Sequence, residues 1–194
     1  VFVNTSNLGT MGRLVPTAPG AAVPVRNELG YARFIDQERY PCQQPPWGEL
    51  TAVNANTGDI AWKAPLGNYD ELGIKNTGTP NVGESIATAG GLVFIAAAND
   101  SRIRAFSSKT GEELWSARME ATGNATPITY QGHDGKQYVV IAAGGPGHLR
   151  NVANTSDTKA DSLVAFSLNG RETEPNFTTS GARPASATSV TAVL

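Results

Sequence analysis

Short stretches of alternating apolar and polar residues recur along the chain, and glycine-rich turns separate them. Residues 49–54 and 102–107 alternate with a period of two, which is typical of a strand with one buried face. Residues 92–97 are apolar throughout, which indicates a strand buried on both faces. Glycine (21) and proline (12) are abundant and charged helix-forming residues are sparse. The pattern therefore favours many short strands and tight turns over helices.

One strand-turn-strand unit occurs twice. Its copies run from Ala52 to Trp62 and from Ala105 to Trp115, and an alanine, a Thr-Gly pair and a tryptophan keep the same internal spacing. The glycine supplies the positive φ that a hairpin turn with a bulge requires. The repeated tryptophan predicts a ring docked against the neighbouring unit, where its burial is worth roughly 2–3 kcal/mol. A chance pair of hairpins is the alternative, but the flanking residues also agree.

The flanks of the second copy complete a unit of four strands. These strands are predicted over residues 85–89, 92–97, 102–107 and 113–118. A partial copy without the Thr-Gly and tryptophan signature is predicted over residues 125–130, 137–143 and 162–168. Four antiparallel strands in a unit of roughly 40–50 residues are typical of a propeller blade. The predicted fold class is all-β, a partial β-propeller of about two and a half four-stranded antiparallel blades.

The predicted blades occupy residues 1–168, and residues 8–48 are interpreted as a long insertion because they are rich in Pro and Gly with little periodicity. Residues 169–194 are low in complexity and are expected to form a disordered tail, or one ordered only by a partner. The chain begins within a strand-like run without an initiator methionine, so it is interpreted as a piece of a longer protein. The N-terminus of that protein is expected to supply the missing outer strand of the last blade.

Composition narrows the possible functions. The net charge is −2 and the residues form no basic stripe, so nucleic acid is not an expected partner. No apolar run approaches the ~20 residues that a membrane-spanning helix needs. Cys42 is the one cysteine, so neither an intrachain disulfide nor a two-cysteine metal site is possible.

Several longer stretches resemble one protein family. They are PPWGELTAVN (45–54), WKAPLG (62–67), IATAGGLVFI (86–95), RAF (104–106), ATP (125–127) and GKQYVVIAAGG (135–145). In this order they resemble the C-terminal blades of a quinoprotein dehydrogenase that depends on pyrroloquinoline quinone (PQQ), of the membrane-type glucose, quinate and polyol dehydrogenase family. The resemblance spans roughly residues 1–168.

The resemblance implies an eight-bladed ring with PQQ and a calcium or magnesium ion near its axis. It also implies oxidation of an alcohol, polyol or sugar, transfer of electrons to ubiquinone or a cytochrome, and a location in the bacterial periplasm, with any membrane anchor upstream. In the family the catalytic aspartate, the PQQ-binding lysine and arginine and the metal ligands lie in earlier blades. No catalytic or metal-ligating residue is therefore assigned to this chain, and it is expected to bind no PQQ alone.

Asp100 is the candidate cofactor-binding residue. It follows a buried strand, at the end from which propellers present side chains to the axial cavity, and the resemblance implies an aspartate close to PQQ there. The alternative is ordinary turn chemistry, since Asn99-Asp100-Ser101 is a favoured turn sequence. His133 and His148 lack a spaced partner and make a poor metal site. Glu84 is expected to face solvent, and Cys42 is expected to be a buried or semi-buried thiol. Trp47 is expected to pack beneath the insertion.

Two hypotheses about function remain open at this point. The chain is either part of a dehydrogenase that is active only in the complete ring, or part of a non-catalytic propeller that binds proteins. An axial aspartate favours the first hypothesis. In both, the remaining blades are the expected partners, and the isolated chain is expected to self-associate through the apolar faces that they would cover.

Overall fold

The computed structural model describes residues 1–145, 152–153, 160–167 and 191–193. The strands of the first part are β1 (Phe2–Ser6), β2 (Thr10–Met11), β3 (Leu14–Pro16), β4 (Val25–Asn27), β5 (Ala32–Arg33), β6 (Gly48–Val53) and β7 (Ile60–Pro65). A 3-10 turn, η1 (Asp70–Leu72), follows. The remaining strands are β8 (Ser85–Ala87), β9 (Leu92–Ile95), β10 (Arg102–Ser107), β11 (Glu113–Arg118), β12 (Ile128–Gln131), β13 (Gln137–Ala143), β14 (Ser162–Ser167) and β15 (Thr191–Val193). No helix in the described ranges is long and apolar enough to cross a membrane.

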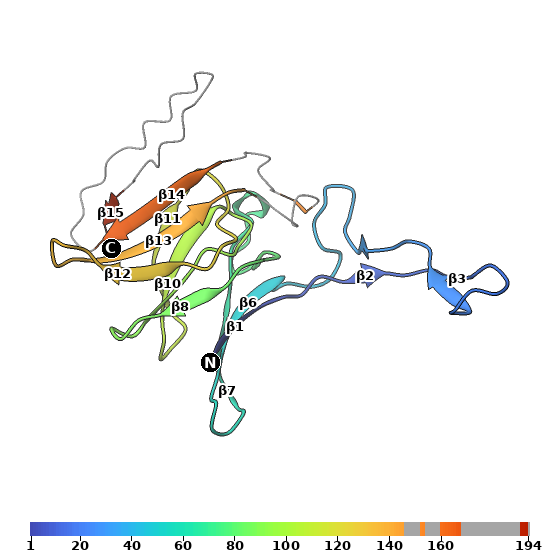
Figure 1. Cartoon of the computed structure of the whole chain (residues 1–194), viewed down its shortest axis with the longest axis horizontal. Coiled ribbons are helices and arrows are strands. Elements are labelled where there is room, and N and C mark those ends of the chain that lie inside the picture. The colour runs from blue at the N-terminus through green and yellow to red at the C-terminus, as the bar shows by residue number, and fades with distance from the viewer. Residues whose placement is uncertain (146–151, 154–159, 168–190, 194) are drawn as a thin grey trace, which may run out of the picture.

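Three sheets form the body of the protein (Figure 1). Their strand orders are β1-β6-β7, β11-β10-β9-β8 and β12-β13-β14-β15, and we call them the first, second and third sheets. Apolar clusters join the first sheet to the second and the second to the third. The predicted fold class, an all-β partial propeller, is confirmed.

The second sheet is buried on both faces. Along β9, Val93 and Ile95 contact the first sheet, whereas Phe94 contacts the third sheet. The same division holds on β10, where Phe106 packs toward the first sheet and Ile103 toward the third. Successive side chains of a strand point to opposite faces, so a continuous apolar run supplies both interfaces.

Trp62 on β7 joins the first sheet to a turn of the second. Its Nε1 donates a hydrogen bond to the Ser108 carbonyl at 3.1 Å. Gly111 lies so close beneath the indole that a Cβ there would come within 2.5 Å of the Trp62 ring. The Phe2 ring covers the indole from its own sheet, with centroids 5.8 Å apart. A side chain at Gly111 would therefore displace the indole.

The third sheet packs on Trp115 and has a short parallel strand at its outer edge. The Trp115 ring meets Phe166 of β14 edge to face, with centroids 5.2 Å apart. Beyond β14, β15 pairs in parallel through Ala165↔Thr191 to Ser167↔Val193. These three residues of β15 are the part of the predicted tail that the structure describes.

A long arm leaves the first sheet between β1 and β6. It contains two antiparallel ladders, β2 with β5 and β3 with β4, and extends away from the three sheets (Figure 1). We call residues 8–34 the arm. The chain returns through an isolated bridge between Ile35 and Pro41 before β6 begins.

Strand bounds follow the sequence pattern where main-chain pairing is regular. The strands predicted over 102–107, 113–118 and 137–143 coincide with β10, β11 and β13. Other predicted bounds were wrong. The strand predicted over residues 85–89 ends at Ala87, the apolar strand predicted to Ala97 ends at Ile95, and the strand predicted from residue 125 begins at Ile128. Strand β7 continues beyond Trp62, because pairing extends to Glu49↔Pro65.

The two repeated turn glycines provide a matched test of the tryptophan contact. Gly111 (φ +74°) faces Trp62, whereas Gly58 (φ +80°) has open space where a Cβ would lie. Gly58→Ala should lower the free energy of unfolding by about 1–2 kcal/mol, because L-residues are strained at positive φ. Gly111→Ala should lower it by a further ~1–3 kcal/mol, because the methyl group collides with the indole.

Urea unfolding of both variants, in the wild-type chain and in a Trp62→Ala chain, measures this difference. Removing the indole should cost about 2–3 kcal/mol by itself. It should also make the two glycine substitutions equal. Equal costs in the wild-type chain would contradict the contact.

Candidate functional site around Asp100

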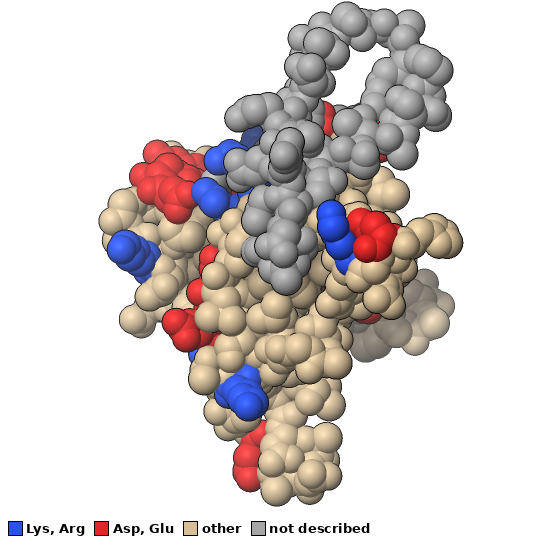
Figure 2. Space-filling view, turned by 90° about the vertical axis from the view of Figure 1, so that its left-hand side faces the viewer, with Lys and Arg blue, Asp and Glu red and all other residues tan. Residues whose placement is uncertain are grey.

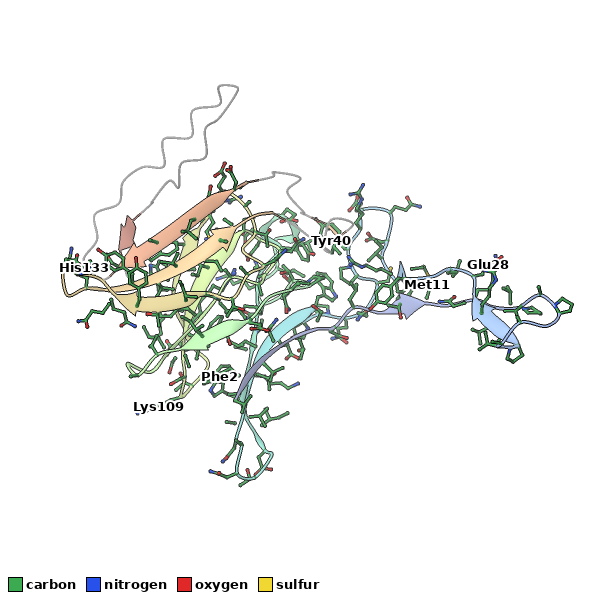
Figure 3. All side chains as sticks on the ribbon, in the orientation of Figure 1. Phe2, Met11, Glu28, Tyr40, Lys109 and His133 are labelled. Carbon is green, nitrogen blue, oxygen red and sulfur yellow. The ribbon has the colours of Figure 1, made fainter. Side chains whose placement is uncertain are left out.

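Connections from all three sheets gather at one end of the body. Because neighbouring strands alternate in direction, one end holds the segments 7–47, 66–84, 96–101 and 119–127, with Val152–Ala153, and we call it the loop end. The opposite end holds the tight hairpin turns 54–59, 88–91, 108–112 and 132–136. In Figure 3, Lys109 and His133 of these turns lie on one side of the body and Tyr40 on the other.

Asp100 lies in the loop end, where it holds two elements together. Its side chain is only 7% exposed. Both carboxylate oxygens accept hydrogen bonds from Arg104, with Nη1 to Oδ1 at 2.9 Å and Nη2 to Oδ2 as the second bond. Oδ2 also accepts the backbone N–H of Asn68 at 3.1 Å. Asp100 therefore links β10 to the connection that follows β7.

Arg104 is the buried cation of this group. Its side chain is 5% exposed, and its Nε donates to Glu113 Oε2 at 3.1 Å. Burial alone would lower the pKa of the guanidinium, but the hydrogen bonds and charges of Asp100 and then Glu113 outweigh burial and raise it. Arg104 thus stays charged and compensates Asp100. Sequence reasoning missed this partner, although Arg104 falls in the RAF stretch.

The neighbouring Asn99 ties the second sheet to the third. Its backbone N–H donates to Thr79 Oγ1 at 2.9 Å, and its Nδ2 donates to the Ala153 carbonyl at 3.0 Å. The Ala153 N–H in turn donates to the Arg39 carbonyl at the base of the arm, at 3.0 Å. Ser101 follows with φ +55°, which turns the chain back into β10. The Asn99-Asp100-Ser101 turn is thus fixed from several directions.

An aromatic cluster lies beside this turn. Tyr69 is fully buried, with ring centroids 5.1 Å from Tyr40 and 5.6 Å from Trp47. Trp47 is 6% exposed and its Nε1 donates to the Gln43 carbonyl at 2.7 Å, so it packs beneath the arm as predicted. Ala153 completes the cluster. The rings fasten the base of the arm to the loop end.

The two tyrosines of the cluster resist ionisation. The pKa of Tyr40 is raised to about 12, and burial is the largest cause. The hydrogen bond that its hydroxyl donates to Glu71, at 2.9 Å, and the negative charge of that carboxylate also raise it. Burial likewise raises the pKa of Tyr69, while the neighbouring Asn99 side chain opposes the rise. Both phenols are therefore neutral at physiological pH. The Tyr40 hydroxyl donates a hydrogen bond to Glu71, whereas the Tyr69 ring serves in packing.

The other candidate residues lie outside this group. His133 is exposed in a hairpin turn at the opposite end, and His148 lies outside the described residues. Glu84 is exposed and accepts a hydrogen bond from Thr126 Oγ1 at 2.9 Å. Cys42, expected to be at least partly buried, is exposed. That expectation was wrong because residue 42 lies on the returning segment of the insertion, outside the apolar clusters.

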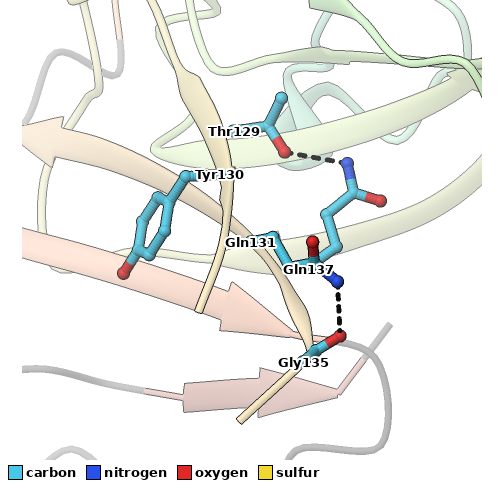
Figure 4. A pocket seen from close by; sticks show the side chains of 5 residues that line it. All are labelled: Thr129, Tyr130, Gln131, Gly135 and Gln137. Carbon is cyan, nitrogen blue, oxygen red and sulfur yellow. Dashed lines mark hydrogen bonds between the residues drawn. The ribbon is translucent and has the colours of Figure 1, made fainter. Parts of the chain in front are cut away.

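A shallow hollow also lies far from Asp100. It is lined by Thr129, Tyr130, Gln131, Gly135 and Gln137 of the β12–β13 hairpin (Figure 4). Gln137 Nε2 donates to Thr129 Oγ1 at 2.8 Å, so these polar groups already satisfy one another. On the face in Figure 2, acidic and basic side chains are interspersed over a mostly uncharged surface.

Comparison with known proteins gives the family. The model for the PQQ β-propeller domain of glucose, ethanol and alcohol dehydrogenases matches residues 2–139. The chain belongs to this family. The resemblance noted in the sequence is therefore confirmed.

Relatives of this PQQ propeller chain are much longer proteins. The probable quinate dehydrogenase (quinone) of Xanthomonas campestris pv. juglandis is 38% identical over 195 residues, 87% of this chain and 24% of that protein. The quinate/shikimate dehydrogenase (quinone) of Acinetobacter baylyi is 39% identical over 196 residues, which is 87% of this chain and 23% of that protein. The solved quinohemoprotein alcohol dehydrogenase of Comamonas testosteroni is 32% identical over 54% of this chain and 14% of that chain, with a TM-score of 0.43. This chain spans about a quarter of the length of the curated relatives.

The described residues do not by themselves fit the metal and PQQ that the family implies. No three His, Cys, Asp or Glu side chains in the described ranges are grouped so that they could hold a metal ion. The carboxylate of Asp100 is already bound by Arg104 and Asn68. Within the described ranges, the carboxylate nearest the loop-end turns is therefore already engaged by protein groups.

Breaking the Asp100–Arg104 pair should destabilise the chain. Asp100→Asn keeps an acceptor for the Asn68 N–H but removes the charge that balances a buried guanidinium, which should cost about 3–5 kcal/mol. Adding Arg104→Met should recover part of this loss, because no uncompensated charge is left. Urea unfolding of the single and double variants measures the coupling. Glu113→Gln, at the more exposed partner, is the control and should cost under about 1 kcal/mol.

Alkaline titration should show that Tyr40 ionises at a higher pH than an ordinary tyrosine. Its folded pKa of about 12 lies above its ordinary value of 10.0, so its stabilising contribution is complete below pH ~10 and is lost as pH rises through ~12. The tyrosinate absorbance of wild type minus that of Tyr40→Phe should give this pKa. Glu71→Gln should lower it but leave the part due to burial. A Tyr40 transition at its ordinary pH would contradict the described packing.

Proposed function

We propose that this chain is the C-terminal part of a PQQ-dependent dehydrogenase. The whole protein would oxidise an alcohol, polyol or sugar and pass electrons to a quinone or a cytochrome. The chain would contribute the closing blades and Asp100, and would be inactive alone. The family match over residues 2–139, combined with coverage of about a quarter of each relative, carries this proposal.

Uncovered surfaces at both ends of the stack of sheets support the proposal that further blades pack there. The outer face of the third sheet carries Ile128, Tyr130 and Leu163, which are 58%, 49% and 46% exposed. On the first sheet, the turn at Gly58 has open space where the equivalent Gly111 receives Trp62. We propose that tryptophan docking joins successive blades, and that a ring from a preceding blade fills the Gly58 position. In the isolated chain these surfaces would drive self-association.

Asp100 would border the PQQ site in the complete ring. Its position in the loop end, beside connections from two other sheets, supports this role. Its carboxylate would act through the Arg104 pair, holding the Asn68 segment in place while presenting negative charge to the cofactor's surroundings. When bound, PQQ would supply the two-electron oxidising power. Calcium or magnesium would be held by residues of other blades.

The names of the relatives suggest the classes of substrate and acceptor. Proteins named quinate dehydrogenase (quinone), glycerol dehydrogenase large subunit and 1-butanol dehydrogenase (cytochrome c) all match this chain. We propose an alcohol, polyol or sugar substrate and a quinone or cytochrome acceptor in the bacterial periplasm.

Steady-state assays of the full-length protein that contains this chain test the proposal. With PQQ, calcium and a quinone analogue, it should oxidise at least one of glucose, glycerol or quinate, and the 194-residue chain alone should oxidise none. Asp100→Asn should lower activity or PQQ affinity about 10–100-fold, as losses beside a cofactor commonly do. Asp59→Asn, in an exposed hairpin turn, is the control. Full-length protein that is folded yet binds no PQQ would favour the protein-binding scaffold instead.

A further inference from the structure

The tip of the arm is an exposed apolar hairpin. Within it, Leu14, Val23 and Val25 are 72%, 56% and 45% exposed, and further along the arm Tyr31 is 87% exposed. A two-stranded ladder has no second layer to cover such side chains. Figure 3 shows Met11 and Glu28, which lie on the arm, well away from the sheets. Folding of the described chain therefore leaves these side chains in water.

Charge is distributed unevenly along this hairpin. Residues 14–25 (LVPTAPGAAVPV) contain no charged side chain and a single hydroxyl, that of Thr17. Arg13 and Arg26 stand directly at the two ends of this run. Arg13 pairs with Glu28, and Arg26 makes no ion pair within the described ranges. An uncharged apolar tip bordered by cations is complementary to a bilayer surface with anionic headgroups.

The backbone of the tip is also suited to a medium that lacks water. Pro16, Pro19 and Pro24 have no N–H to desolvate. The Thr17 N–H donates to the Pro24 carbonyl and the Ala21 N–H to the Ala18 carbonyl, both at 3.1 Å. The three prolines and these two hydrogen bonds reduce the number of backbone donors that would lose water as a partner at a lipid surface.

The same prolines argue against a second protein strand as the occupant. Pro16 lies in β3, and Pro24 directly precedes β4. Proline removes ladder hydrogen bonds and blocks pairing at an edge, so neither edge of this short ladder is a good template for another strand.

We infer that the hairpin 13–26 docks on an anionic lipid surface. Leu14, Val23 and Val25 enter the interfacial region, and Arg13 and Arg26 lie at the headgroups. Since the arm leaves the body from the loop end, docking places this end nearest the lipid. The lipid contact is independent of the dehydrogenase proposal, because it needs neither PQQ nor substrate.

Vesicle flotation of the full 194-residue chain tests this inference. Vesicles of phosphatidylcholine with about a third phosphatidylglycerol should bind the wild type, and pure phosphatidylcholine should bind it less. Leu14→Ser/Val23→Ser/Val25→Ser should reduce binding at least tenfold. Ile60→Ser/Leu114→Ser, which removes two aliphatic side chains that are 57% and 53% exposed elsewhere, should bind as the wild type does.

A separate variant tests how much the two arginines contribute to vesicle binding. Arg13→Gln/Arg26→Gln should lower binding to the anionic vesicles by about fivefold per charge and remove most of the preference over phosphatidylcholine. Thermal unfolding should be unchanged in all arm variants, because the tip lies outside the sheets. A fluorophore at Ala21→Cys in a Cys42→Ser chain should shift to the blue on binding.

Two results would overturn the inference. One is equal vesicle binding by the wild type and the triple arm variant. The other is sedimentation without lipid in which the triple variant alone converts an oligomer to a smaller species. That second result would assign the tip to a contact between copies of this chain.

Discussion

A sheet that is apolar on both faces cannot remain exposed to water, and β9 gives the second sheet two such faces. Val93 and Ile95 require a partner on one side, and Phe94 requires one on the other. The first and third sheets exist as packed layers because they cover this strand. The third sheet then presents Ile128, Tyr130 and Leu163 on its outer face. Stacking of this kind closes only when sheets surround an axis.

The loop end depends on that stacking. Asn99 and Asp100 belong to the connection between β9 and β10. They meet Ala153 and Asn68 of other connections because the sheets bring one set of strand ends together. The buried Arg104 is acceptable there because Asp100 and Glu113 balance its charge. A rigid, charge-balanced turn of this kind is suited to form the wall of a cofactor site. Family membership implies PQQ in the complete protein, and the proposed role of Asp100 rests on this charge-balanced turn.

The arm, unlike the body, is not held by packing between sheets. Its residues form no cluster with the sheets beyond its aromatic base at Tyr40 and Trp47. Its apolar side chains are therefore not explained by folding of the described chain. In the proposed lipid contact, the body would be the scaffold and the arm the point of attachment.

The sequence by itself determined the strands, the turns and the blade repeat. An apolar run such as residues 92–97, or a Thr-Gly turn before Trp62, imposes its conformation through local sterics and side-chain periodicity, so neighbouring residues suffice to predict it. It also placed Asp100 in a turn after a buried strand and Trp47 beneath the insertion.

Only the tertiary structure decided which partners those residues have. The pairing of Asp100 with Arg104, the meeting of Asn99 with Ala153, the parallel addition of β15 and the exposure of Cys42 all depend on how distant segments pack. No local pattern encodes them, because the free energy of a contact between remote residues depends on the layers that bring them together.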